Sequence, residues 1–238
     1  MNRGGGGGAV AQEAAPPAGQ FDSERLDRLR RVMRLGALMI LGAGLYVAIG
    51  LAASAAAVAV PDSVRVGVPF LFLPILVLRW AGQPWDLGGL NRTLAYSAAV
   101  YAPFAVWLAL GIPTSPQTYA PGAAALTGGA VVVWWSIDTF FHVGAVDYIT
   151  KRVVQHESAA LFGERRSLVF SVVAWSLGHV VEWFWLRAAL GEIGAAAFLV
   201  LAGIATAMAY ARWKNVLGLM IGHFLLNVAV AAAAVVSL

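Results

Sequence analysis

Three histidines and a few acidic or amide side chains lie within long apolar stretches of this sequence. His142 lies in one stretch, His179 in the next, and His223 with Asn227 in the last. Ionisable groups inside a membrane are costly, and they usually face the interior of a helical bundle and serve a function there. These residues therefore predict a site between helices, in the interior of the bundle.

The spacing of these residues adds geometry to that prediction. His223 and Asn227 are four positions apart, as are Trp175 and His179, so each pair shares one face of a helix. We expect Asp147, at the cytoplasmic end of the preceding apolar stretch, to approach both imidazoles. A carboxylate, two imidazoles and an amide can activate water and stabilise an oxyanion. They can also hold a metal ion that keeps one position open.

The order and spacing resemble the CPBP family (CAAX-protease and bacteriocin-processing), the type II CAAX prenyl endopeptidase-like intramembrane proteases. That family has Glu-Glu-x-x-x-Arg, Phe-x-x-x-His and His-x-x-x-Asn on successive membrane helices. The corresponding segments here are DYITKR (147–152), WSLGH (175–179) and HFLLN (223–227). The likeness covers about residues 125–235. It departs from the family in the first motif, where Asp147 and Tyr148 stand in place of the two Glu residues.

The resemblance implies a role for each matched residue. Asp147 takes the place of the Glu that activates the attacking water, although its side chain is shorter by one C–C bond, about 1.5 Å. His179 and His223 would polarise the peptide carbonyl, and Asn227 would help to hold the oxyanion. If a metal such as zinc is used, its ligands would be His179, His223 and Asp147. The supporting residues would be Tyr148, Arg152, Trp175 and, as a substitute carboxylate, Glu182.

The composition indicates the kind of fold that positions these residues. The 238-residue chain is 60% hydrophobic and 12% charged, whereas a soluble domain is about 45–50% apolar and about 25% charged. There is no cysteine, which excludes disulfides and thiolate metal sites. We predict an all-α, polytopic transmembrane bundle of about seven helices, because a membrane span needs ~20 apolar residues. The predicted segments are about 35–60, 64–80, 94–112, 122–147, 167–190, 194–211 and 215–238.

The chain is predicted to have three parts. Residues 1–22 are rich in Gly, Ala and Pro and are expected to form a disordered tail. Residues 23–34 have leucines at helical spacing among arginines, which favours a basic amphipathic juxtamembrane segment. Residues 35–238 form the transmembrane domain, whose second helix is expected to be kinked by Pro69 and Pro74.

The charges predict an orientation in the membrane. With the N-terminus inside and the C-terminus outside, all Lys and Arg residues except Arg65 and Arg187 fall in cytoplasmic segments, including a predicted loop at 148–166. This split follows the positive-inside rule and favours the cytoplasmic membrane. Because the basic residues lie in short loops, we expect the net charge of +4 to meet anionic lipid headgroups rather than nucleic acid.

Three functions are compatible with these features. The first is an intramembrane endopeptidase that hydrolyses a membrane-associated peptide or protein. The second is an inactive relative that binds a membrane partner through the same pocket, and the loss of the Glu pair favours it. The third is a proton-coupled transporter that uses Asp138, His142 and Glu182. The absence of an internal repeat counts against this function.

Overall fold

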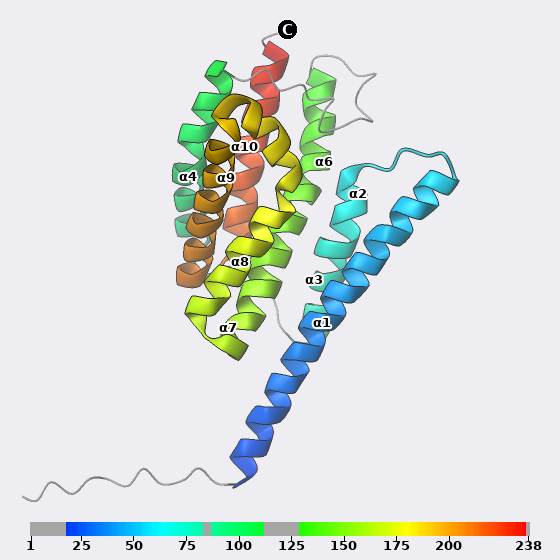
Figure 1. Cartoon of the computed structure of the whole chain (residues 1–238), viewed down its shortest axis with the longest axis vertical. Coiled ribbons are helices and arrows are strands. Elements are labelled where there is room, and N and C mark those ends of the chain that lie inside the picture. Colours follow the sequence, from blue (N-terminus) through cyan, green and yellow to red (C-terminus); the bar gives the residue numbers. More distant parts are fainter. Residues whose placement is uncertain (1–17, 83–86, 112–128, 237–238) are drawn as a thin grey trace, which may run out of the picture.

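The computed structural model describes residues 18–82, 87–111 and 129–236, and these ranges are almost entirely helical, with no strand (Figure 1). The predicted all-α class is therefore confirmed. The predicted tail lies outside the described residues as far as residue 17, and residues 18–22 belong to the first helix. The elements are α1 (Ala18–Ala55), α2 (Asp62–Gly67), η1 (Val68–Phe72), α3 (Leu73–Trp80), α4 (Leu90–Gly111), α6 (Gly129–Asp147), η3 (Tyr148–Gln155), α7 (His156–Phe162), α8 (Glu164–Gly178), α9 (Val180–Trp213) and α10 (Val216–Val236).

Two of the long helices contain a π-helical stretch. Between α2 and α3, η1 begins next to Pro69, and Pro74 follows in α3. The kink predicted at these prolines is thus a π-helical stretch. Proline has no backbone N–H, so it cannot donate the regular helical hydrogen bond. The second stretch, η3, continues α6 directly into α7.

The prediction of a loop at 148–166 is wrong for most of these residues. Residues 148–162 extend α6, and the chain turns only at Gly163, whose φ of 84° suits glycine. Thr150 and Gln155 of η3 are buried with a hydrogen-bond partner each. Thr150 donates to the carbonyl of Val146 (2.7 Å) and Gln155 donates to that of Ala207 (2.8 Å). Asp147 therefore lies near the middle of a continuous helix, and not at its cytoplasmic end.

The predicted span 167–190 is divided in two. Helix α8 ends at Gly178, and α9 begins at Val180, so His179 occupies the break with φ −108° and ψ 20°. Within α9, Gly191 adopts φ 70°, and the chain turns back at this point. A helix end offers backbone groups that are free to bind side chains, and the break frees His179 from the regular helical ladder.

Helices α4 and α10 pack with their backbones close together. A Cβ atom placed on Gly218 would lie 2.9 Å from the backbone nitrogen of Leu94, and one on Gly222 would lie 2.5 Å from the Cβ of Ser97. Small residues four apart allow this approach, as in other membrane helix pairs. Asn215 sits at the start of α10, where its side chain accepts from the backbone N–H of Gly218 (2.8 Å). The packing fixes the position of His223, the residue after Gly222.

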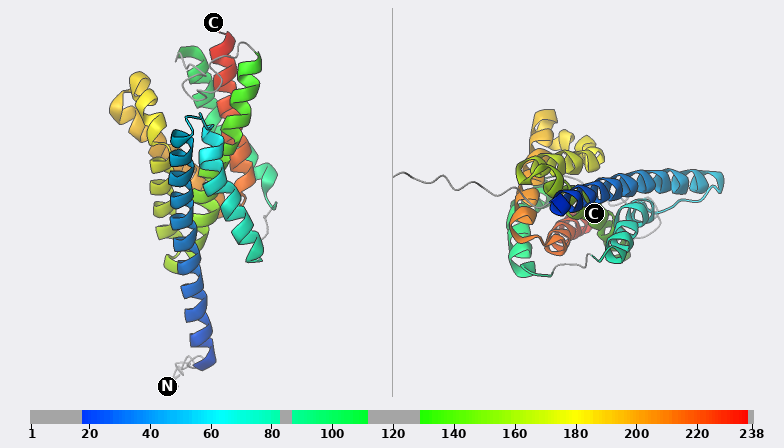
Figure 2. Two further views of the ribbon diagram at one scale, coloured as in Figure 1. Left: turned by 90° about the vertical axis from the view of Figure 1, so that its right-hand side faces the viewer. Right: turned by 90° about the horizontal axis from the view of Figure 1, so that it is seen from below.

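Helix α1 lies along one side of the bundle and extends beyond it at the N-terminal end (Figures 1 and 2). Two arginines of the predicted headgroup segment instead bind a carboxylate of α7: Arg34 lies 3.0 Å and Arg31 3.5 Å from the fully buried Glu157. His156, the residue before Glu157, stays neutral, since burial and then the nearby Arg152 guanidinium lower its pKa to about 4. A buried carboxylate needs such partners, so this ion pair anchors α1.

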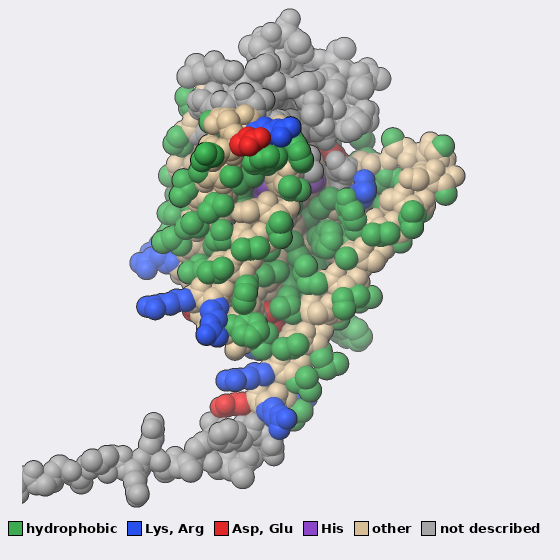
Figure 3. All heavy atoms as spheres, in the orientation of Figure 1, with side chains coloured by type: hydrophobic (Ala, Val, Ile, Leu, Met, Phe, Trp, Pro, Cys, Tyr) green, Lys and Arg blue, Asp and Glu red, His purple; other side chains and the backbone are tan. Residues whose placement is uncertain are grey.

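The surface of the described bundle is largely apolar, and hydrophobic side chains cover the face seen in Figure 3. Within the described ranges, three helical stretches are long and apolar enough to cross a membrane: Ser23–Ala55, Ser63–Trp80 and Leu190–Trp213. Exposed apolar surface of this extent is typical of a protein that faces lipid. These apolar helices indicate a helical membrane protein. Three of the seven predicted spans are long and apolar enough to cross a membrane.

Candidate active site

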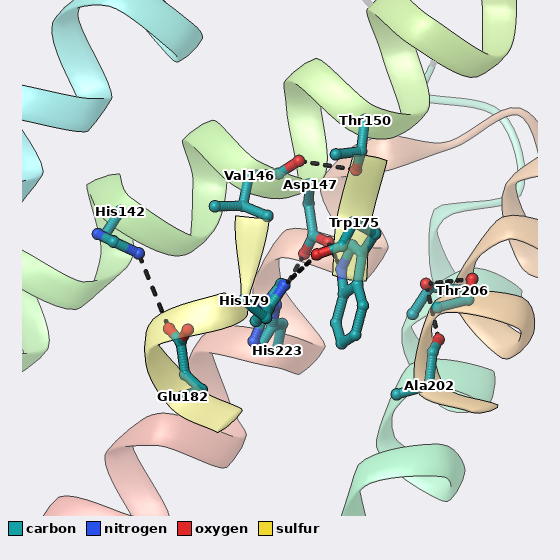
Figure 4. A network of polar contacts seen from close by, with 11 residues as sticks. His142, Val146, Asp147, Thr150, Trp175, His179, Glu182, Ala202, Thr206 and His223 are labelled. Atoms are coloured by element: carbon teal, nitrogen blue, oxygen red, sulfur yellow. Dashed lines mark hydrogen bonds and ion pairs between the residues drawn. The ribbon is translucent and has the colours of Figure 1, made fainter. Parts of the chain in front are cut away.

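Asp147 is the centre of a hydrogen-bonded network that joins three helices (Figure 4). Its side chain is fully buried. One carboxylate oxygen accepts from the indole N–H of Trp175 on α8 (3.1 Å), and the other lies 3.1 Å from Nδ1 of His223 on α10. Because a carboxylate only accepts hydrogen bonds, Nδ1 of His223 carries the proton in this pair. The buried carboxylate thus fixes the orientation and the tautomer of the imidazole.

His179 joins the same network from the break between α8 and α9. Its Nδ1 lies 2.7 Å from the backbone carbonyl of Trp175, an acceptor, so this nitrogen also carries a proton. The ring of His179 lies on the indole of Trp175, with centroids 3.7 Å apart, and its centroid is 5.3 Å from that of His223 at an interplanar angle of 24°. The two imidazoles predicted to converge are therefore neighbours.

The geometry leaves one nitrogen of each imidazole able to act as a base. With Nδ1 of His223 bound to Asp147, its Nε2 carries the lone pair. This is the arrangement in which a buried carboxylate orients a histidine that removes a proton from a nucleophile. Each oxygen of Asp147 accepts from one N–H donor, so the residue that the sequence predicts to activate the water is also placed to orient His223.

The three predicted metal ligands do not fit a metal ion. The stacked rings of His179 and His223 turn their faces toward each other, and Asp147 uses both oxygens on N–H donors. Their nitrogens and oxygens therefore do not converge on one point, as the tetrahedral ligands of zinc must. Among the residues that the structure describes, no group of three His, Asp or Glu side chains is arranged to hold a metal.

The other residues matched to the family motifs lie around this network. Asn227 is half-buried on α10, one turn beyond His223. Tyr148 packs in the hydrophobic core with Ile149 and Tyr210, and Arg152 is half-buried one turn farther along η3. Trp175, predicted only as a supporting residue, makes direct contact with both Asp147 and His179. The sequence could not show this, because an aromatic side chain in a span is usually a packing residue.

Glu182 and Asp138 have partners outside the network. Glu182 faces His142 of α6, with 4.0 Å between the nearest carboxylate oxygen and imidazole nitrogen (Figure 4). Asp138 binds the start of α2, where it accepts hydrogen bonds from the backbone N–H and the hydroxyl of Ser63. Such a carboxylate satisfies a free N–H at a helix N-terminus. Asp138 and His142 share a helix face as predicted, but they serve separate partners.

Two residues that the motifs do not include lie close to the network. Lys151, one turn after Asp147, is fully buried and donates to the hydroxyl of Ser171 on α8 (3.0 Å). Its Nζ also lies 5.8 Å from the centroid of the Trp175 ring. Tyr101 of α4 stacks on His223, with ring centroids 5.2 Å apart. Lys151 lies four positions after Asp147, and this spacing could have indicated that Lys151 lies near the site. Nothing in the sequence indicates that Tyr101 does.

No family model, no curated protein and no solved structure matches this chain.

Proposed function

We propose that the protein is an intramembrane endopeptidase that uses His223 as its general base and Asp147 as the carboxylate that orients it. The observation that carries this proposal is the 3.1 Å contact between Nδ1 of His223 and the fully buried Asp147. Burying a charged carboxylate is costly unless it is paired and hydrogen-bonded, as Asp147 is with His223 and Trp175. Here the carboxylate orients the imidazole that also stacks with His179 and Tyr101.

In the proposed reaction, Nε2 of His223 removes a proton from water while the water oxygen attacks the peptide carbonyl carbon. The carbonyl π electrons move to oxygen and form an oxyanion. When the oxyanion collapses, the C–N bond breaks, and His223 returns the proton to the leaving nitrogen. His179, through its free Nε2, accepts a hydrogen bond from the water or from the scissile N–H and holds it in line.

This arrangement supports hydrolysis more directly than proton transport. A transporter built on Asp138, His142 and Glu182 would need these groups to exchange protons with one another. Asp138 instead binds the N-terminus of α2, while His142 and Glu182 form a separate pair. An inactive relative would bind peptides in the same site but would not cleave them. A measurement of peptide cleavage therefore separates this alternative from the protease.

The first test is cleavage of peptides by the purified protein in liposomes. The probe is a mixture of synthetic hydrophobic peptides of randomised sequence in the same bilayer, with new termini detected by mass spectrometry. We expect the parent to cleave the mixture and His223→Ala to abolish cleavage, because no other imidazole is bound to Asp147. An inactive parent that still binds these peptides would support the binding-only alternative.

We also propose that the bundle crosses the cytoplasmic membrane seven times, with the N-terminus inside and the C-terminus outside. In Figure 1 the N-terminal end of α1 and the turn between α7 and α8 lie at one end, and the C-terminal end of α10 lies at the other. The exposed Arg165 and Arg166 lie at that first end, as the positive-inside rule requires.

Cysteine labelling tests this orientation directly, because the chain has no native cysteine. Single cysteines at Arg165 and at Glu192, both exposed, are expected to react with a membrane-impermeant maleimide from opposite sides of the membrane. The measurement is labelling of inside-out and right-side-out vesicles. Reaction of both positions from the same side would show that the number of spans between them is not odd.

A further inference from the structure

Tyr101 contributes a hydroxyl to the candidate site from a helix that none of the motifs includes. Its side chain is 3% exposed, and its ring stacks on His223 at an interplanar angle of 25°. The same imidazole is bound to Asp147 through Nδ1. The phenol therefore lies beside the dyad of Asp147 and His223, on the α4 side of α10.

The hydroxyl of Tyr101 has no hydrogen-bond partner among the described residues. A buried hydroxyl without a partner costs about 1–3 kcal/mol, and nearly all buried polar groups in proteins are paired. A phenylalanine would make the same ring contact with His223 without this cost. The position therefore carries a polar atom that the fold itself does not use.

The N–H groups of the network are already engaged. The indole N–H of Trp175 and Nδ1 of His223 both bind Asp147, and Nδ1 of His179 binds a backbone carbonyl. Asn227 is only half-buried, one turn along α10. The hydroxyl of Tyr101 is available as a donor.

We infer that Tyr101 is a catalytic residue whose hydroxyl donates a hydrogen bond to the carbonyl oxygen of the scissile peptide bond. This inference rests on the proposed function. As the water oxygen bonds to the carbonyl carbon, the negative charge develops on that oxygen, and the phenolic O–H stabilises it. The hydrogen bond breaks when the carbonyl re-forms and the C–N bond is cleaved, so Tyr101 keeps its proton throughout.

Tyr101→Phe tests this role because it removes only the hydroxyl. We expect kcat for peptide cleavage to fall by about 10²–10³-fold, as for the loss of other oxyanion donors, while KM stays unchanged. The thermal stability should stay the same or rise, since no hydrogen bond in the fold is lost. The matched control is Tyr96→Phe on the same helix, a half-buried ring that packs edge-on against Trp213. We expect this variant to keep the parental kcat.

The experiment uses the full chain in liposomes and one peptide that the parent cleaves from the randomised mixture. Parental kcat in Tyr101→Phe would overturn the role of Tyr101 and leave the proposed protease intact. A parallel loss of kcat and of thermal stability would also overturn it, because the hydroxyl would then be a structural group. If the parent cleaves no peptide in the mixture, the proposed function fails, and the role of Tyr101 fails with it.

Discussion

Replacing Asp147 with Asn is expected to lower kcat/KM for peptide cleavage by about 10⁴-fold. An amide keeps the size of the side chain but can donate a hydrogen bond to Nδ1 of His223, so the imidazole changes tautomer and Nε2 loses its lone pair. The same exchange in carboxylate–histidine hydrolases costs about this factor. The measurement is steady-state cleavage by the reconstituted variant, with KM and kcat determined separately.

Glu164→Gln is the matched control for this substitution. Glu164 is an exposed carboxylate at the start of α8, and its partner is Lys214 on the surface (2.8 Å). We expect its loss to leave kcat/KM unchanged, because exposed ion pairs contribute little. Retained activity in Asp147→Asn together with inactivation by Glu182→Gln would place the essential carboxylate at Glu182 and contradict the proposed dyad.

Gly222→Ala is expected to cause the largest loss of stability among single-methyl changes in the described bundle. The new Cβ would lie 2.5 Å from the Cβ of Ser97 and still closer to its hydroxyl oxygen, so α4 and α10 must separate. Overpacking of this kind costs about 1–3 kcal/mol. Because His223 is the next residue, cleavage should fall as well. The measurement is the thermal unfolding temperature of the protein in detergent micelles.

A second substitution separates the helix contact from other effects of the alanine. In Ser97→Gly combined with Gly222→Ala, the nearest remaining atom is the backbone carbon of residue 97 at 3.5 Å, an ordinary contact, so stability should recover. Gly218→Ala should have no such rescue, since its Cβ would meet the backbone nitrogen of Leu94 at 2.9 Å. Gly44→Ala, with open space around it, is the neutral control. Equal unfolding temperatures for Gly222→Ala and Gly44→Ala would contradict this account of the packing.

Much of this protein follows from local sequence patterns. Long apolar stretches dictate helices in a membrane, because backbone hydrogen bonds must be satisfied within the segment. The pairs Trp175 with His179 and His223 with Asn227 share a helix turn, so their spacing was informative. The polar groups on three helices also predicted one shared site, and Asp147, His179 and His223 do lie together.

The tertiary structure decided the parts that depend on contacts between helices. Residues 148–155 are polar in sequence and read as a loop, yet they are buried because Ser171 of α8 and the Ala207 carbonyl of α9 satisfy Lys151 and Gln155. No local pattern contains those partners.

The same reason applies to the chemistry of the site. The sequence supplied Asp147 and His223, but only the packing of α6 against α8 and α10 places a donor on each carboxylate oxygen and so makes the carboxylate an orienting group. Tyr101 comes within 5.2 Å of His223, centroid to centroid, because Gly218 and Gly222 bring α4 close to α10. Hydrogen-bond direction and ring contact between distant segments depend on how closely two helices pack, and residue spacing along one helix does not encode that distance.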